Sequence, residues 1–249
     1  MTTQSLEDIA PTGTRPTTAT WPSPGQAARI AGAGYVCVFL LAIFANFYVR
    51  EGLVVPGDVA GTVANITGSI WLFRLGLLAF LAIFLLDIVI AWALHVVFRE
   101  VNRDLSLVTA WFRLVYSALF GVALLFIFQV VHLVDGAESL AAVGPDIVNG
   151  QVMLALESFS TTWLIGLAAF GLHLVLLGRL VVTSGTASRW MGALLAVAGG
   201  AYLLDTAAHA TLGNYDEFAA VFLLVVALPS MVGEGWLGLW LLLSHRIGR

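Results

Sequence analysis

The sequence predicts an all-α, polytopic membrane protein: a bundle of six transmembrane helices with both termini on the cytoplasmic side. Of the 249 residues, 60% are hydrophobic and 10% are charged, and the mean hydropathy is +0.96, whereas soluble globular proteins carry about 25% charged residues. The chain also contains six apolar runs, each long enough for a spanning helix, which needs about 20 residues. A third observation, the distribution of arginine, predicts the orientation.

The apolar runs divide the chain into a tail, a membrane domain and a short end. Residues 1–26 are rich in Thr, Pro and Ser without apolar periodicity, which predicts a disordered cytoplasmic tail. Residues 27–245 are the expected six-helix transmembrane domain, and residues 246–249 are an expected cytoplasmic C-terminus. Because Cys37 is the only cysteine, an internal disulfide is excluded. The expected spans are residues 30–49, 71–98, 107–134, 152–182, 190–210 and 218–243.

Arginine is the only cationic residue type besides histidine, and it is distributed unevenly. With the N-terminus inside, eight arginines lie in cytoplasmic segments and only Arg50 lies in an outer loop. Since basic residues accumulate on the cytoplasmic side of membrane proteins, we expect both termini to be cytoplasmic. The eight are Arg15, Arg29, Arg99, Arg103, Arg179, Arg189, Arg246 and Arg249.

Two outer loops carry local signals of their own. In the first, Asp58 precedes Val59, Val63 and Ile66, a spacing that predicts a short helix capped by Asp58. The loop over residues 135–151 is acidic and contains Gly144-Pro145, so turns or a broken helix are expected there.

Six charged residues lie inside the apolar runs. A charged side chain at mid-span costs about 2.5–3.5 kcal/mol on insertion scales, so such residues usually face the bundle interior and find partners. Complete pairing with two arginines still leaves two carboxylates, which must be protonated, hydrated or bound to a cation. The six are Arg74, Asp87, Arg113, Glu157, Asp205 and Glu234.

Position along the spans sorts these residues by depth. Arg74, Glu157, Asp205 and His209 belong to the outer half, where they are candidates for a shared pocket, since Asp205 and His209 lie on one helix face. Asp87 and Glu234 belong near the midplane, and Arg113 and His173 lie in the inner half. The alternative interpretation is that these charges only fix helix packing.

The last span contains a proline and two glycines around Glu234. Pro229 removes a backbone hydrogen bond and kinks a helix, and Gly233 and Gly235 permit close packing or local unwinding. A carboxylate within such a break is typical of transporter sites at the bilayer midplane. The alternative is an ordinary kink.

The histidines support a different hypothesis. His95 and His173 lie toward the inside and His132 and His209 toward the outside, an arrangement that resembles cytochrome b561, which holds two haems by bis-histidine ligation. A zinc site built from His132, Glu157, Asp205 and His209 is a further alternative, although no HExxH motif occurs. The sequence also lacks Gly-x-Ser-x-Gly, phosphate-binding loops and long basic patches, so nucleic-acid binding is not expected.

An ordered series of short segments runs through residues 27–245: Trp71–Gly76, Leu86-Asp87, Val101–Arg103, Ala110–Arg113, Gly171–His173, Leu177-Gly178, Tyr202–Asp205 and Val232–Glu234. This series resembles a bacterial family of six-span membrane proteins, domain of unknown function 4386. The resemblance implies a six-helix fold in the bacterial cytoplasmic membrane and supplies no activity. Three of the four histidines that two haems need, His95, His132 and His209, lie outside its pattern.

These observations favour a small-molecule or ion transporter, proton-coupled through its interior carboxylates. Glu234 and Asp87 would then be protonatable, Arg74 and Arg113 would pair with carboxylates or hold an anionic substrate, and Asp205 and His209 would line the outward access path. The expected partners are the lipid bilayer and the transported solute, and no cofactor is expected. A two-haem electron-transfer protein and a non-catalytic scaffold or sensor subunit remain as alternatives, and enzymatic activity is undecided.

Overall fold

The computed structural model describes residues 22–136, 142 and 144–243, and within these ranges the chain is helical and contains no strand. It has six helices long and apolar enough to cross a membrane, which confirms the predicted fold class. The first comprises α1 (Pro24–Ala42), the π-helix η1 (Ile43–Arg50) and α2 (Glu51–Leu53). The others are α4 (Ile70–Phe98), α5 (Arg103–Asp135), α6 (Pro145–Ser184), α7 (Arg189–Thr211) and α8 (Ala219–Leu243).

Two helix starts differ from the sequence prediction. Helix α1 begins inside the expected tail, because the Ser23 hydroxyl and the Gln26 side chain form a reciprocal capping box. Helix α5 ends at Asp135 and helix α6 begins at Pro145, so the expected turns or helix break occur but stop before Pro145 instead of extending to residue 151. Proline suits the first position of a helix, and Gly144 precedes it with a φ of 93°. Residues 1–21 and 244–249, which hold most of the expected tail and the C-terminal segment, lie outside the described residues.

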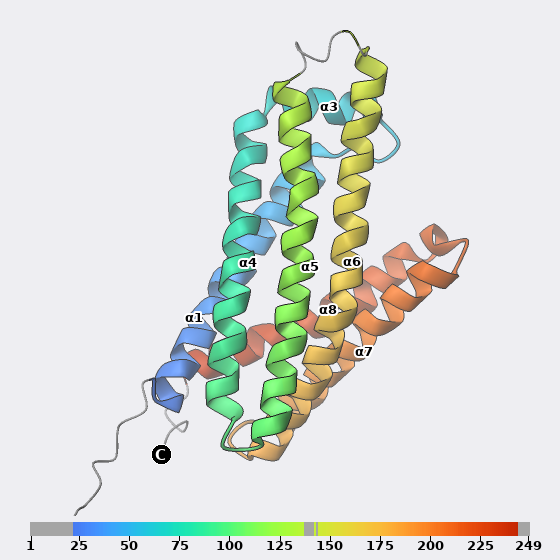
Figure 1. The fold of residues 1–249 in the computed structure, drawn as a ribbon. Helices are drawn as coiled ribbons and strands as arrows, with labels where there is room; N and C mark the ends of the chain where they lie inside the picture. Colours follow the sequence, from blue (N-terminus) through green and yellow to red (C-terminus); the bar gives the residue numbers. More distant parts are fainter. Residues whose placement is uncertain (1–21, 137–141, 143, 244–249) are drawn as a thin grey trace, which may run out of the picture.

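The short helix predicted after the first span is confirmed as α3 (Val59–Gly68). The Asp58 carboxylate accepts a hydrogen bond from the Gly61 amide at 2.8 Å, and the Thr62 hydroxyl accepts one from the Val55 amide at 2.9 Å. The first bond caps α3, and the second ties α3 to the residues that follow the first span. Figure 1 shows α3 lying across one end of the bundle, over the ends of the long helices.

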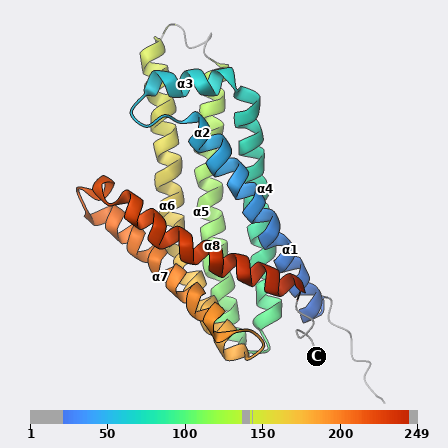
Figure 2. The same cartoon turned by 180° about the vertical axis from the view of Figure 1, so that it is seen from behind.

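The six spanning helices close a ring. Each packs against the next along the chain, and α8 returns to pack against α1. Helices α4, α5 and α6 stand side by side as one layer, and α1 and α8 cross one face of this layer (Figures 1 and 2). Helix α7 leans away from α6, so the α7–α8 connection, which contains the 3-10 helix η2 (Tyr215–Glu217), lies partway along the bundle instead of level with α3.

Glycines set how closely helices approach at two crossings. Between α6 and α7, a Cβ on Gly171 would lie 2.7 Å from the Gly199 carbonyl oxygen, and one on Gly192 would lie 2.6 Å from that of Gly178. Two glycine pairs therefore bring these backbones into contact, as small residues do at membrane helix interfaces. Gly199 makes this close contact, whereas the neighbouring Gly200 faces open space.

The second glycine crossing joins α1 to α8. A Cβ on Gly32 would lie 2.5 Å from the Leu242 amide nitrogen, and one on Gly238 would lie 2.8 Å from the Tyr35 Cβ. From this crossing the two helices diverge toward the α3 end of the bundle (Figure 2). They also have the smallest buried shares of the six spans, 28% for the first span and 17% for α8, so they form the most exposed wall of the ring.

The glycine contact between α6 and α7 gives a stability test with a neighbouring control. In Gly199→Ala the added methyl would meet the Val175 backbone nitrogen at 2.8 Å, so we expect the free energy of unfolding to fall by about 1–3 kcal/mol, as in overpacked sites. Gly200→Ala meets nothing within 4 Å and should be neutral or gain up to about 1 kcal/mol from helix propensity. Unfolding in mixed micelles measures both; equal effects would contradict the close packing.

Candidate functional site

The centre of the ring holds a buried ion pair between α5 and α4. Arg113 is 1% exposed and Asp87 is 2% exposed. The Arg113 Nε donates to Asp87 Oδ1 at 3.0 Å, and its Nη2 donates to the same oxygen in a very short contact. The two charges neutralise each other, which allows both to lie inside the apolar bundle.

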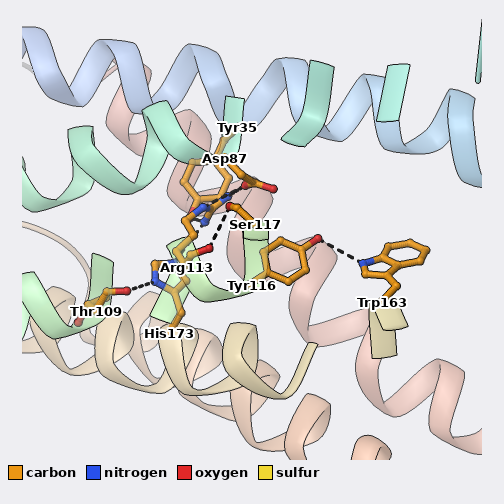
Figure 3. A network of polar contacts seen from close by, with 8 residues as sticks. All are labelled: Tyr35, Asp87, Thr109, Arg113, Tyr116, Ser117, Trp163 and His173. Carbon is orange, nitrogen blue, oxygen red and sulfur yellow. Dashed lines mark hydrogen bonds and ion pairs between the residues drawn. The ribbon is translucent and has the colours of Figure 1, made fainter. Parts of the chain in front are cut away.

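Two further helices supply partners to the same guanidinium. Arg113 Nη1 donates to the Tyr35 hydroxyl of α1 at 2.8 Å and contacts His173 Nε2 of α6 at 3.2 Å. His173 Nδ1 lies 2.9 Å from the Thr109 carbonyl oxygen, which can only accept. The imidazole therefore carries its proton on Nδ1 and accepts from Arg113 through Nε2. Figure 3 shows Tyr35, Asp87 and His173 gathered around Arg113, which we call the arginine cluster.

A cavity of about 650 Å³ lies beside the arginine cluster and is lined by all six spanning helices. Its volume is in the range of roughly 300–1,000 Å³ that is typical of small-molecule sites. The charged residues of its lining, among those the structure describes, are Asp87, Arg113 and Glu234. The ring of helices therefore encloses a space large enough for a ligand, with charges on its wall.

Glu234 differs from the other two charged residues because no protein group holds it. It lies near the middle of α8 and is half-buried. Within the described ranges it makes no hydrogen bond and no ion pair, although it is close enough to interact electrostatically with Arg113 and Asp87. When Glu234 is ionised, the three groups carry a net charge of minus one; when it is protonated they are neutral. Either a proton or a cationic ligand can therefore balance the site.

Aromatic rings form much of the remaining wall. Phe120 lies 5.6 Å from Trp163 between ring centroids, and Tyr116 lies 4.7 Å from Phe170. The Trp163 indole N–H donates to the Tyr116 hydroxyl at 3.3 Å (Figure 3), which fixes two of the rings. The main rings of the lining come from α4 to α7 and are Phe80, Tyr116, Phe120, Trp163, Phe170 and Tyr202.

The exposed residues that line the cavity belong to the first span and to α8, which places its mouth between α1 and α8. The residues of its lining that are exposed there are apolar: Leu40 on α1 is 62% exposed, and Leu223 and Leu239 on α8 are 61% and 53% exposed. Because both helices are membrane spans, this mouth faces the lipid. A molecule dissolved in the bilayer would meet it directly.

The π-helix η1 also contributes to the lining through Ile43, Asn46 and Phe47. Such segments are uncommon and occur frequently at functional sites. Asn46 Oδ1 accepts from Arg50 Nε at 2.8 Å, and Asn46 Nδ2 donates to Glu51 at 3.2 Å, so polar contacts hold its far end. Hydropathy does not distinguish a π-helix from an α-helix, so the apolar run over these residues gives no sign of this feature.

The structure does not form the outer pocket that the sequence suggested. Arg74 pairs instead with Asp135, with Nη2 and Oδ2 2.5 Å apart. Asp205 accepts from the Tyr215 hydroxyl at 2.6 Å, and Glu157 is exposed. The outer pocket would need upright helices, whereas α7 leans away from the end of the bundle at which α4 begins (Figure 1).

His209, four residues after Asp205, also contacts Tyr215 at the periphery of the bundle. Its ring centroid is 4.1 Å from that of Tyr215. Burial, followed by the hydrogen bond to Asp205, raises the pKa of the Tyr215 hydroxyl above its usual value. This tyrosine thus stays a neutral donor that fastens the α7–α8 connection, and neither residue lines the cavity.

The histidines have separate environments. His95 Nδ1 lies 2.8 Å from the Ser106 hydroxyl, and His132 and His209 are exposed. Both ring nitrogens of His173 are used by Arg113 and Thr109. Among the described residues no three His, Cys, Asp or Glu side chains are grouped so that they could hold a metal ion. The structure therefore does not bring His132, Glu157, Asp205 and His209 together as the zinc alternative needs.

The unwinding suggested for the last span is absent. Helix α8 runs continuously through Pro229 to Leu243. The Ser230 hydroxyl donates to the Val226 carbonyl oxygen, one turn earlier in the same helix, at 2.5 Å. Glu234 thus projects from an intact helix turn, and Gly233 packs in ordinary contact with Leu195 of α7.

The ion pair gives a test that separates charge pairing from bulk. Asp87→Asn keeps the shape but leaves the Arg113 charge buried without its anion, so we expect the free energy of unfolding to fall by about 3–5 kcal/mol. The double variant Asp87→Leu with Arg113→Met removes both charges and should regain most of the loss. Detergent unfolding of the three proteins measures this. If Asp87→Asn were as stable as the wild type, the pair would not hold the bundle.

Comparison with known proteins places the chain in a family. The family model described as "Domain of unknown function (DUF4386)" matches residues 30–244. An uncharacterized protein of Archaeoglobus fulgidus is 28% identical over 164 residues, which cover 66% of this chain and 80% of that protein. No solved structure matches the chain. Because the family model spans nearly all of the six-helix domain, the chain belongs to the DUF4386 family of multi-pass membrane proteins.

Proposed function

We propose that the protein is a proton-coupled transporter that binds a small molecule in the cavity of the helix ring. One observation carries the proposal: all six spans line one cavity, and a carboxylate on its wall, that of Glu234, has no protein partner within the described residues. Intramembrane carboxylates are costly and mark ion and substrate pathways. A group that only fixed packing would be expected to have a partner, as Asp87 has.

The three charged residues of the cavity then have different roles. Arg113 uses four of its five N–H groups on Asp87, Tyr35 and His173. It therefore acts as a fixed anchor that neutralises Asp87 and positions the wall, and it is not free to clamp an anionic substrate. Glu234 is the group that exchanges its proton as substrate binds.

Helix α8 is the element best suited to move between access states. It is the least buried span, and Pro229 deprives it of one backbone hydrogen bond. It carries Glu234 and borders the mouth of the cavity. A tilt of α8 about the glycine crossing with α1 would change the exposure of Glu234 while the arginine cluster on the other helices stays intact.

The transport role is tested with full-length protein in liposomes that contain the pH dye pyranine. A panel of organic cations, amino acids and organic anions is added under an imposed proton gradient. We expect at least one solute to drive proton flux through the wild type, and Glu234→Gln to reduce that flux to the level of protein-free liposomes. Glu157→Gln is the matched control, because it removes an exposed carboxylate outside the cavity. Equal flux in wild type and Glu234→Gln would refute the proposed coupling.

We also propose that both termini are cytoplasmic, in the cytoplasmic membrane. The start of α1, the α4–α5 and α6–α7 turns and the end of α8 lie at one end of the bundle (Figure 1), and this end carries Arg29, Arg99, Arg103 and Arg189. Arg50 lies toward the other end. The side with more basic residues is expected to be inside.

Cysteine labelling of intact cells tests this orientation. In a Cys37→Ser background, Gly150→Cys should react with a membrane-impermeant maleimide, since residue 150 is exposed near the start of α6. Glu100→Cys, exposed in the α4–α5 turn, should react only after the cells are permeabilised. The opposite labelling pattern would reverse the topology and leave the fold unaffected.

A further inference from the structure

We infer that the cavity binds a hydrophobic organic molecule with a single positive charge, which reaches it from the lipid between α1 and α8. The inference rests on the proposed function for the place of binding, and it adds the chemical class of the ligand and its route. Three features carry it: the charge balance of the cavity, its aromatic wall and its apolar mouth.

The net charge of the cavity wall favours binding of a monovalent cation. Asp87 is neutralised by Arg113 through two hydrogen bonds to one oxygen. Glu234 shares the wall without an ion pair among the described residues, so an ionised cavity has one uncompensated negative charge. A bound anion would add to that charge in a region of low dielectric, where like charges repel strongly. A cation beside Glu234 would cancel it.

The aromatic wall suits a cation with an apolar body. The chain already holds one cation in this way: the guanidinium carbon of Arg113 lies 4.9 Å from the centre of the Tyr35 ring and 5.3 Å from that of Phe170. Aromatic faces attract cations through their quadrupoles, most strongly in a desolvated site. The rings of Phe80, Phe120 and Trp163 line the same cavity and make no cation contact within the described structure.

The apolar mouth of the cavity favours entry of the ligand from the lipid. Apolar side chains of α1 and α8 surround it, among them Leu40, Leu223 and Leu239, each more than half exposed. A strongly hydrated ion would have to shed its water in hydrocarbon to pass these residues. A hydrophobic cation already partitions into the bilayer and loses little by entering the cavity. Figure 2 shows that α1 and α8 diverge on this side of the bundle.

Binding should compete with protons at Glu234. The titratable or charged groups that interact with it are Tyr35 on α1, Asp87 on α4, Arg113 on α5 and Tyr202 on α7. A permanently charged ligand cannot itself titrate, so any pH dependence belongs to the protein. Its affinity should be high where Glu234 is ionised and should fall as the pH is lowered and Glu234 takes up a proton.

The experiment compares three probes on the full-length protein in detergent. Tetraphenylphosphonium is a hydrophobic cation, tetraphenylborate is an anion of nearly the same size and shape, and tetramethylammonium carries the positive charge without the apolar body. Equilibrium dialysis measures binding in excess of protein-free micelles. We expect saturable binding of tetraphenylphosphonium alone, weakening as the pH falls.

Variants locate the effect at Glu234. Glu234→Gln should lower tetraphenylphosphonium affinity by about 10- to 100-fold, as expected when a charged partner is lost from a buried site, and should remove the pH dependence. Glu157→Gln should bind like the wild type. Size-exclusion profiles and thermal unfolding check that each variant is folded. If Glu234→Gln does not fold, the pH dependence of the wild type and the comparison of the two tetraphenyl probes still test the inference.

The outcomes are decisive and distinct from those of the transport assay. Tighter binding of tetraphenylborate, or affinity of tetraphenylphosphonium that does not change with pH, would overturn the assignment of a cation. Binding of tetramethylammonium as tight as that of tetraphenylphosphonium would overturn the assignment of a hydrophobic ligand, and with it the reason for a route through the lipid. Cation binding without proton flux in liposomes would refute the transporter and leave the ligand class in place, whereas flux driven by another class of solute would do the reverse.

Discussion

The arrangement of this bundle depends on one buried guanidinium, that of Arg113. Its partners Asp87, Tyr35 and His173 come from α4, α1 and α6, so satisfying a single side chain fixes three helices against α5. Buried ion pairs seldom add net stability over well-packed apolar residues, although breaking one is costly. The main consequence here is therefore a defined register, which holds the wall of the cavity in place.

The helices themselves could be predicted from local sequence. Long apolar runs located all six spans, and Asp58 before an apolar-periodic stretch located α3 and its cap. Both signals depend only on residues close in the chain. The errors at Ser23 and Pro145 share one origin: Ser, Pro and Gly occur at helix starts as well as in loops, and composition alone does not distinguish the two.

The grouping of the charged residues could be predicted only in part, because it depends on helix tilt. The sequence identified Asp87, Arg113, His173 and Glu234 as interior groups, and the structure gathers them at one centre. It failed for Asp205, because the glycine contacts between α6 and α7 set the lean of α7 and occur between residues far apart in the chain. Tyr35 and the other lining aromatics were missed, since a tyrosine or phenylalanine in an apolar run does not reveal whether it faces lipid or a cavity.

The separation of an anchored pair from a free carboxylate has a consequence for coupling. With Glu234 protonated, or ionised beside a monovalent cation, the cavity is neutral; with Glu234 ionised and the cavity empty, one charge is uncompensated. An uncompensated charge within the bilayer costs about 2.5–3.5 kcal/mol on insertion scales, so the empty, ionised form is the one least able to expose α8 to the other side. Arg113 neutralises Asp87, so Asp87 does not change the net charge of the cavity. The two neutral forms, one with Glu234 protonated and one with a cation bound beside ionised Glu234, therefore differ by the exchange of one proton for one cation. One-for-one exchange would then follow from the number of unpaired carboxylates on the cavity wall, without a separate gate.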